Sequence, residues 1–280
     1  MLLQDKLRQL GSEGRVLLAT NFYNFETLSG ILQAVKAKDK QIILQLSENS
    51  IEYLGLEVAV NMARAVLKNY NVEGWLHLDH GSSIEIVRRC LDAGFDSVMI
   101  DASELSFEEN IKITAEVVKL AERYNANVEA ELGYIAKLGQ AQLVSQYTQP
   151  DEAKRFAEAT GINALAIAIG TAHGFYKETP QLQLELLSLI HEATPAALVL
   201  HGGSGVPSDQ LQAAIKRGIS KINLATETKN IFMKTLQQVL SKTDEIDLRK
   251  VFPIATASVI NLISEKLEIV SSDYTNDYVY

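Results

Sequence analysis

The stretch "GWLHLDHGSS", residues 74–83, decides the fold of this chain. Its apolar lead-in predicts a buried strand, yet the strand ends in Asp79 and His80, directly before Gly81. Polar groups at the end of a buried strand have a natural place in α/β barrels, because the active sites of those barrels lie at the carboxyl ends of the parallel strands. The stretch therefore predicts a strand and a functional site at its end.

Seven further short apolar runs lie along the chain, at residues 15–22, 41–47, 97–101, 127–133, 164–170, 196–203 and 221–226. Segments with helical periodicity separate them, and strand-like runs that alternate with helices predict parallel strands joined by crossover helices. Eight runs predict an α/β fold with a single (β/α)8 TIM barrel over residues 1–280 and an extra C-terminal helix at 258–270. An open doubly wound sheet is the alternative, but no GxGxxG motif follows the first run.

Composition narrows the class of protein. Acidic and basic residues are interspersed, the net charge is −9, and no basic patch suits nucleic acid or an anionic membrane surface. Hydrophobic residues make up 47 % of the chain, enough for a large core, but no run approaches the length of a membrane span. The single cysteine, Cys90, fits a reducing compartment. We expect a cytoplasmic protein without nucleic-acid or membrane partners.

Polar side chains gather where the predicted strands end. They are Asp79, His80, Asp101, Glu129, Glu131, His173, His201 and Asn223. A catalytic zinc site uses three protein ligands, often imidazoles, and keeps one position open. His80, His173 and His201 could supply those ligands, with His77 as the alternative to His80. His191 falls within a predicted helix and is interpreted as a surface or structural residue.

Two turns near the end of the barrel precede predicted helices. The first, "HGGSG" at 201–205, is rich in glycine, and the second, "NLATETKN" at 223–230, carries hydroxyl groups. The last two loops of such barrels often bind phosphate through backbone N–H groups and a helix N-terminus. Ser204 and Thr226 add hydroxyl donors. Two ordinary tight turns are the alternative interpretation, but their positions in the barrel favour a phosphate site.

These motifs together resemble a known family. "HLDHGSS", "SVMIDAS", "VEAELG", "AIGTAHGFY", "LVLHGGSGVP" and "KINLATETKN" are similar, in order and over nearly the whole chain, to the class II, zinc-dependent ketose-bisphosphate aldolases. The resemblance implies reversible cleavage of fructose or tagatose 1,6-bisphosphate to dihydroxyacetone phosphate and an aldehyde such as glyceraldehyde 3-phosphate. It also implies a Zn²⁺ cofactor, with a monovalent cation as a further candidate, and a homodimer or homotetramer.

The resemblance assigns roles to individual residues of this sequence. His80, His173 and His201 match the zinc ligands, Glu131 matches a secondary carboxylate near the metal, and Asp79 matches the acid/base at the aldehyde oxygen. The positions that match substrate contacts are Ser47, Gly174, Gly202, Gly203, Ser204, Asn223, Ala225, Thr226 and Lys229.

Three departures from the family pattern bear on function. Ala225 stands where the fructose-type branch has aspartate, which favours the tagatose-type branch. Residues 132–150 contain no Asp or Glu, although the family carries there a glutamate that moves the second proton. Glu104 replaces a histidine in "D-x-S-H". These differences leave open an aldolase-like barrel with an altered substrate or different chemistry, and a degenerate, non-catalytic binder of sugar phosphates.

Overall fold

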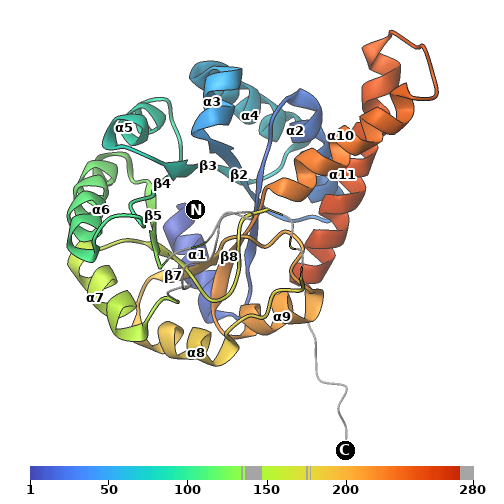
Figure 1. Cartoon of the computed structure of the whole chain (residues 1–280). Coiled ribbons are helices and arrows are strands. Elements are labelled where there is room, and N and C mark those ends of the chain that lie inside the picture. The colour runs from blue at the N-terminus through green and yellow to red at the C-terminus, as the bar shows by residue number, and fades with distance from the viewer. Residues whose placement is uncertain (134, 136–146, 175, 177, 272–280) are drawn as a thin grey trace, which may run out of the picture.

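The computed structural model of the chain describes residues 1–133, 135, 147–174, 176 and 178–271. Eight parallel strands pair in sequence order and form one closed barrel (Figure 1). They are β1 (Leu17–Asn21), β2 (Ile42–Ser47), β3 (Gly74–Gly81), β4 (Ser97–Ile100), β5 (Asn127–Leu132), β6 (Ala164–Ile167), β7 (Ala197–Leu200) and β8 (Ile219–Leu224). The barrel closes where β1 pairs with β8, with Ala19 opposite Asn223.

Helices follow the strands and form an outer ring (Figure 1). They are α2 (Phe25–Ala37), α3 (Glu48–Leu54), α4 (Leu56–Tyr70), α5 (Ile84–Asp92), α6 (Phe107–Ala121) with the short 3-10 helix η1 (Glu122–Tyr124), α7 (Pro150–Thr160), α8 (Leu184–Ala193), α9 (Ser208–Lys216) and α10 (Thr226–Leu240). The predicted (β/α)8 barrel is confirmed, and the open doubly wound sheet is ruled out by the closure of the sheet.

Local sequence sets where several of these helices begin. Ser106 and Glu109 form a reciprocal capping box at the start of α6, as the pattern Ser-x-x-Glu requires. Asn24 and Thr27 do the same for α2, and the Ser83 side chain caps α5. Each cap accepts a backbone N–H that has no partner within its helix, so the chain leaves the carboxyl end of a strand and turns directly into the next helix.

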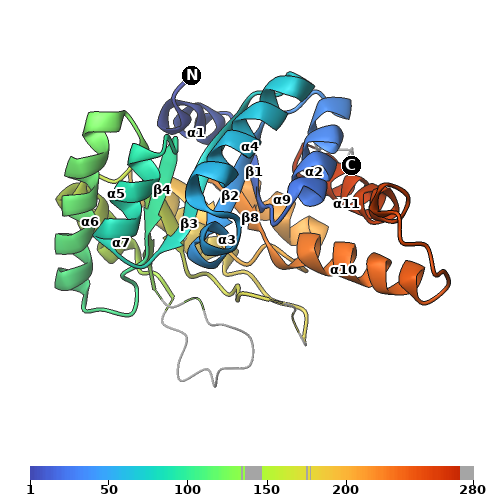
Figure 2. The ribbon, with the colours of Figure 1, turned by 90° about the horizontal axis from the view of Figure 1, so that it is seen from above.

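Two apolar layers hold the barrel together. The larger one fills the space between the strands and the outer helices. The smaller one lies inside the barrel, where Leu17, Ile43 and Trp75 meet Leu3, Leu7 and Leu10 of α1 (Leu3–Ser12). Figure 2 shows α1 on the side of the barrel opposite α3, and α3 follows the carboxyl end of β2. Helix α1 therefore plugs the amino-terminal mouth and leaves the other mouth for the site.

The extra C-terminal helix is also confirmed, and it is longer than predicted. Helix α11 (Leu248–Ser271) packs against α2 and α10 and makes the outer ring double on that side (Figure 1). Val259 of α11 lies so close to Gly30 of α2 that a Cβ at position 30 would be 3.0 Å from the Val259 Cβ. A side chain at position 30 would therefore force the two helices apart.

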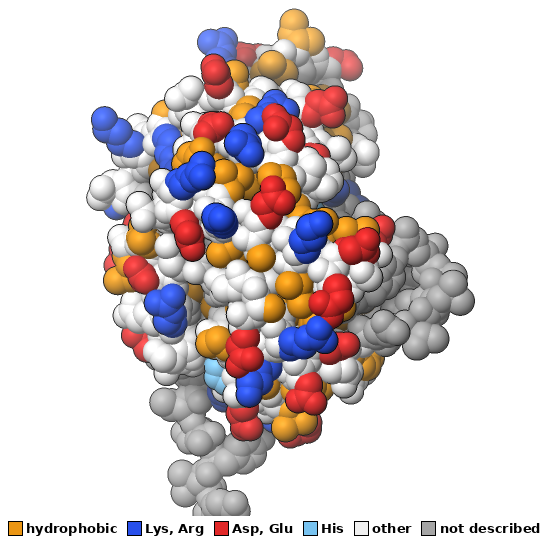
Figure 3. All heavy atoms as spheres, turned by 90° about the vertical axis from the view of Figure 1, so that its left-hand side faces the viewer, with side chains coloured by type: hydrophobic (Ala, Val, Ile, Leu, Met, Phe, Trp, Pro, Cys, Tyr) orange, Lys and Arg blue, Asp and Glu red, His pale blue; other side chains and the backbone are white. Residues whose placement is uncertain are grey.

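Charged side chains of both signs are mixed on the surface (Figure 3), as their distribution along the sequence predicts. On the face shown in Figure 3, acidic and basic side chains alternate without a patch of one sign. Among the described residues, no helix is long and apolar enough to cross a membrane.

The plug formed by α1 can be tested by stability measurements. Leu7→Ala should lower the free energy of unfolding by about 2–5 kcal/mol, because it leaves a cavity among fully buried side chains. Leu2→Ala is the control, since Leu2 is 47 % exposed, and it should change the value by about 0.5 kcal/mol or less. Urea unfolding followed by circular dichroism measures both variants. Equally small effects would show that α1 does not close the barrel.

Candidate active site

A break in the backbone of β3 creates the site. Successive side chains of a strand point to opposite faces, so Asp79 and His80 could not both face inward on a regular strand. His80 has a φ of 55°, a left-handed conformation that is rare outside glycine, and the register of β3 on β4 shifts between Leu78 and Gly81. Gly81 fits this bulge because a Cβ there would lie 2.6 Å from the Met99 carbonyl oxygen. The bulge lets Asp79 and His80 line one cavity.

Three histidines from distant parts of the chain meet at this mouth. The ring centroids lie 4.8 Å apart for His80 and His201, 4.9 Å for His80 and His173, and 5.7 Å for His173 and His201. Glu131, at the end of β5, joins them, and one ligand atom from each of the four residues lies within 4.8 Å of the others. The structure thus brings together the four residues that the sequence predicted as metal ligands.

Hydrogen bonds behind the rings decide which nitrogens face the centre. His80 Nδ1 lies 2.7 Å from Asp101 Oδ2, and His201 Nε2 lies 2.8 Å from Glu129 Oε1. In the neutral rings those nitrogens carry the protons, so His80 Nε2 and His201 Nδ1 present lone pairs to each other at 3.1 Å. Facing lone pairs repel, and either a proton on His80 Nε2 or a metal cation between the two rings removes the repulsion.

This geometry fits a zinc ion. Two ligands of a tetrahedral zinc lie about 3.3 Å apart when each bond is about 2.0–2.1 Å. Glu131 Oε2 is buried without a hydrogen-bond partner among the described residues, and it lies 3.7 Å from His201 Nδ1. A buried oxygen without a donor is costly, and a cation would satisfy it.

The electrostatics of the cluster also favour a cation. Burial lowers the pKa of His80, but the hydrogen bond to Asp101 and the charges of Asp79 and Glu131 outweigh it and raise the pKa to about 9. Burial, reinforced by the charge of Asp101, raises the pKa of Glu131 to about 8. The His80 shift shows that the carboxylates around the centre stabilise positive charge there, whereas the Glu131 shift shows that burial and the charge of Asp101 make a second negative charge costly unless a cation offsets it.

Asp79 is held by three amide groups. Asn21 Nδ2 donates to Oδ2 at 2.9 Å, while Gln45 Nε2 and Asn223 Nδ2 donate to Oδ1 at 3.3 and 3.4 Å. Burial raises the pKa of Asp79, but His80, His201 and the Asn21 hydrogen bond outweigh it, so the pKa lies below its ordinary value. The side chain is therefore an oriented carboxylate that can accept a proton. The sequence analysis missed Asn21 and Gln45, although both are polar residues within predicted strands.

The cavity in front of Asp79 has a volume of about 50 Å³. It is lined by Asn21, Asp79, His80, His173, Gly174, Gly202, Ser204, Asn223, Ala225 and Thr226. Six of these were predicted as substrate contacts. Gly202 has a φ of 65°, and a Cβ there would lie 2.4 Å from the Ala172 carbonyl oxygen, so the loop after β7 requires glycine at this position.

Three other predicted substrate contacts lie outside this lining. Ser47 caps α3 by accepting a hydrogen bond from the Ser50 backbone N–H. Gly203 is buried, and its N–H donates to the Asn223 carbonyl oxygen at 3.1 Å. Lys229 is exposed on α10, with its Nζ 5.8 Å from the centroid of the Tyr23 ring.

Two other residues named in the sequence analysis are exposed. His191 is exposed in the last turn of α8, as expected of a surface residue. Glu104, which replaces a histidine of the family pattern, is exposed after β4 and is not among the described residues that line the cavity. Residues 134 and 136–146 lie outside the described residues, and most of the loop without acidic residues lies with them.

Comparisons with known proteins agree with this geometry. The model of the family described as class-II fructose-bisphosphate aldolase matches residues 2–275. The chain is 40 % identical over 261 residues to a fructose-bisphosphate aldolase of Geobacillus stearothermophilus, covering 90 % of each chain. It is 35 % identical over 289 aligned positions to a fructose-bisphosphate aldolase of Helicobacter pylori, covering 93 % of this chain and 94 % of the relative.

A solved structure supports the same relationship. The chain superimposes on the YdjI aldolase from Escherichia coli K12 with a TM-score of 0.87, at 30 % identity and with 97 % of both chains covered. The match covers nearly the whole of both chains, and aldolases are carbon–carbon lyases. Together with the cluster of three histidines beside Asp79, the comparisons show that this chain belongs to the class II fructose-bisphosphate aldolase family.

Proposed function

We propose that the chain catalyses zinc-dependent, reversible aldol cleavage of a ketose 1,6-bisphosphate to dihydroxyacetone phosphate and an aldehyde such as glyceraldehyde 3-phosphate. The observation that carries the proposal is one cavity in which the oriented carboxylate of Asp79 lies beside His80 and His173, two members of a cluster suited to a metal. Membership of the aldolase family supports the reaction type. The zinc ion and the identity of the ketose are the parts that are proposed.

His80, His173 and His201 would hold the zinc ion, with Glu131 beside it. When bound, Zn²⁺ supplies a Lewis acid that stabilises the negative charge developing on the oxygens of the dihydroxyacetone half. Asp101 and Glu129 hold the rings of His80 and His201 from behind, so neither ring has to reorient when the metal binds.

Asp79 would move the proton of the hydroxyl group on the fourth carbon. During cleavage its carboxylate accepts that proton, and the bond between the third and fourth carbons breaks. The electron pair of that bond remains on the dihydroxyacetone half, whose third carbon then takes a proton from water to give dihydroxyacetone phosphate. During condensation the protonated Asp79 returns the proton to the aldehyde oxygen. The amides of Asn21 and Asn223 keep the carboxylate aimed into the cavity.

Backbone N–H groups would bind the phosphate of the dihydroxyacetone half. Gly202 and Ser204 lie in the loop after β7, and Thr226 is the first residue of α10. A helix N-terminus carries unpaired N–H groups and a partial positive charge, which suit a phosphate dianion. Gly174, beside the ligand His173, lines the same cavity.

Selection between ketoses that differ in configuration at the fourth carbon depends on the residue at position 225, which is a small alanine. Ala225 lines the cavity, and its methyl group cannot form a hydrogen bond with a substrate hydroxyl in either configuration. Position 225 therefore adds no polar partner to Asp79 that would favour one configuration of this hydroxyl over the other. We therefore propose that both tagatose and fructose 1,6-bisphosphate are substrates, although the relatives are named for fructose bisphosphate.

Metal content gives the first test. Purified protein should contain about one zinc per chain by mass spectrometry, since the site offers the ligands of a catalytic zinc. His201→Ala should lose the metal, and His191→Ala, which removes an exposed histidine from α8, should keep it. Chelation should abolish cleavage, and added zinc should restore it. Undiminished cleavage by metal-free protein would overturn the mechanism.

The role of Asp79 can be separated from that of the metal. Asp79→Asn should retain zinc but lower the turnover number by roughly 10²–10⁴-fold, the usual contribution of a positioned acid/base. Asp151→Asn, an exposed position in the first turn of α7, is the control and should leave turnover unchanged. Near-normal turnover in Asp79→Asn would assign the proton to another residue.

Substrate choice is tested by assaying both bisphosphates with coupled detection of dihydroxyacetone phosphate. We expect kcat/KM values within about two orders of magnitude of each other, because Ala225 offers no polar group to distinguish them. Ala225→Asp should change the ratio, since a carboxylate can accept a hydrogen bond from only a suitably placed hydroxyl. Failure to cleave either sugar, in zinc-loaded protein that binds both, would identify a non-catalytic binder and refute the proposal.

A further inference from the structure

A lysine is buried inside the barrel just below the histidine cluster. Lys221 of β8 is 1 % exposed, and lysine is almost never buried to this degree without a partner. Its Nζ donates to Glu129 Oε2 at 2.6 Å and lies 3.2 Å from His77 Nε2. Lys221 is not among the described residues that line the cavity, so it acts only through its neighbours.

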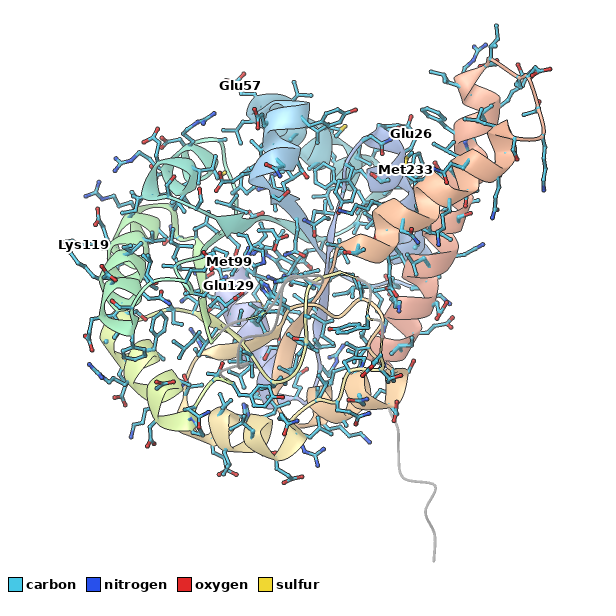
Figure 4. All side chains as sticks on the ribbon, in the orientation of Figure 1. Glu26, Glu57, Met99, Lys119, Glu129 and Met233 are labelled. Carbon is cyan, nitrogen blue, oxygen red and sulfur yellow. The ribbon has the colours of Figure 1, made fainter. Side chains whose placement is uncertain are left out.

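Glu129 connects this lysine to the metal site. Its Oε2 accepts the hydrogen bond from Lys221, and its Oε1 accepts one from His201 Nε2 at 2.8 Å. Glu129 and His201 are both fully buried, so neither can replace these partners with water. Figure 4 shows Glu129 near the centre of the barrel. One carboxylate therefore sets both the proton position and the orientation of the His201 ring.

The other side of Lys221 is anchored to three strands. His77 accepts at Nε2 from Lys221, which leaves its proton on Nδ1, 2.7 Å from Ser97 Oγ. Asn127 Nδ2 donates to the same Ser97 oxygen at 2.8 Å. Burial holds the pKa of His77 well below its usual value, so the ring is a neutral acceptor. The Lys221 ammonium group therefore has a hydrogen-bond partner on each side, Glu129 and His77, and these two partners hold it in place.

Fold stability alone does not explain this arrangement. The interiors of TIM barrels are usually filled by branched apolar residues, and a buried ion pair is often no more stable than an apolar pair of similar volume. The lower layer of this barrel is apolar in that way, with Ile43 and Val199 facing inward. The charged layer appears only next to the histidines, where Glu129 must remain in place to accept from His201.

We propose that Lys221 is a positioning residue for the metal site, which it serves by holding Glu129 where that carboxylate orients His201 with Nδ1 toward the metal. The inference rests on the proposed zinc site. Without the Lys221 ammonium group the Glu129 oxygen Oε2 would be buried without its donor, and the carboxylate would move toward other donors. The His201 ring would then lose the hydrogen bond that fixes it.

The test compares zinc affinity, measured by competition with a chelating dye, in the wild type and in Lys221→Met. Methionine fills a similar volume without charge. We expect zinc affinity to fall about 10–100-fold, the usual effect of removing a partner behind a metal ligand. Cobalt-loaded protein should show altered d–d absorption, and kcat should fall more than KM rises. Unchanged zinc affinity and an unchanged cobalt spectrum would overturn the inference while leaving the proposed function intact.

Two further variants separate positioning from folding. Lys221→Met combined with Glu129→Gln should recover most of the zinc affinity, because the amide oxygen still accepts from His201 and no charge is left unpaired. Lys266→Met removes the other buried lysine among the described residues, whose partner is Glu227. Its zinc affinity should equal that of the wild type. A loss of affinity as large as that in Lys221→Met would show a general effect of core disruption.

The wild-type protein provides a measurement that does not depend on any variant folding. Nitrogen-15 NMR of metal-free protein should show His201 as the tautomer protonated at Nε2, with Nδ1 unprotonated. The opposite tautomer would overturn the inference directly. Wild-type protein that binds no zinc would instead refute the proposed function together with the inference, so the two failures are distinguishable.

Discussion

The pairing of β1 with β8 is the constraint on which the site depends. It places Ala19 opposite Asn223 and removes both edges of the sheet, so all eight carboxyl ends meet at one mouth. Asn21 and Asn223 stand on either side of this seam, 202 positions apart in the chain, and both donate to Asp79. An open sheet of the same strands would leave the carboxylate without one of these donors. Closure therefore orients the proposed proton carrier as well as completing the fold.

The interior of the barrel is divided along its axis. Apolar side chains and the plug helix α1 fill the amino-terminal part, the Lys221–Glu129 pair lies above them, and the histidines occupy the carboxyl mouth. Water is excluded from the middle layer, which strengthens each electrostatic contact there. The proposed metal ligands thus rest on hydrogen bonds that are themselves packed on a rigid base, and precise ligand geometry follows from ordinary core packing.

The left-handed backbone conformation of His80 positions side chains at the carboxyl mouth of the barrel. A left-handed residue that is not glycine is strained, by about 1–3 kcal/mol where such conformations have been analysed. Here the strain has a clear consequence, because it turns two consecutive side chains, Asp79 and His80, toward one cavity. His80 is held in that position by Asp101, and Gly81 leaves room for the neighbouring strand. A proton carrier and a metal ligand can therefore be adjacent in sequence and in space.

Sequence by itself determined the eight strands, the helices between them and the polar residues at the strand ends, because periodicity and composition are local properties of the chain. The rule that barrel sites lie at carboxyl ends then predicted that His80, His173 and His201 meet, and the structure brings them together. Only the tertiary structure decided that Asn21, Gln45 and Lys221 support the site, and that Ser47, Gly203 and Lys229 stand outside the cavity. Alternation along a strand shows which residues share a face, but contacts across the barrel depend on register and closure, which no local pattern contains.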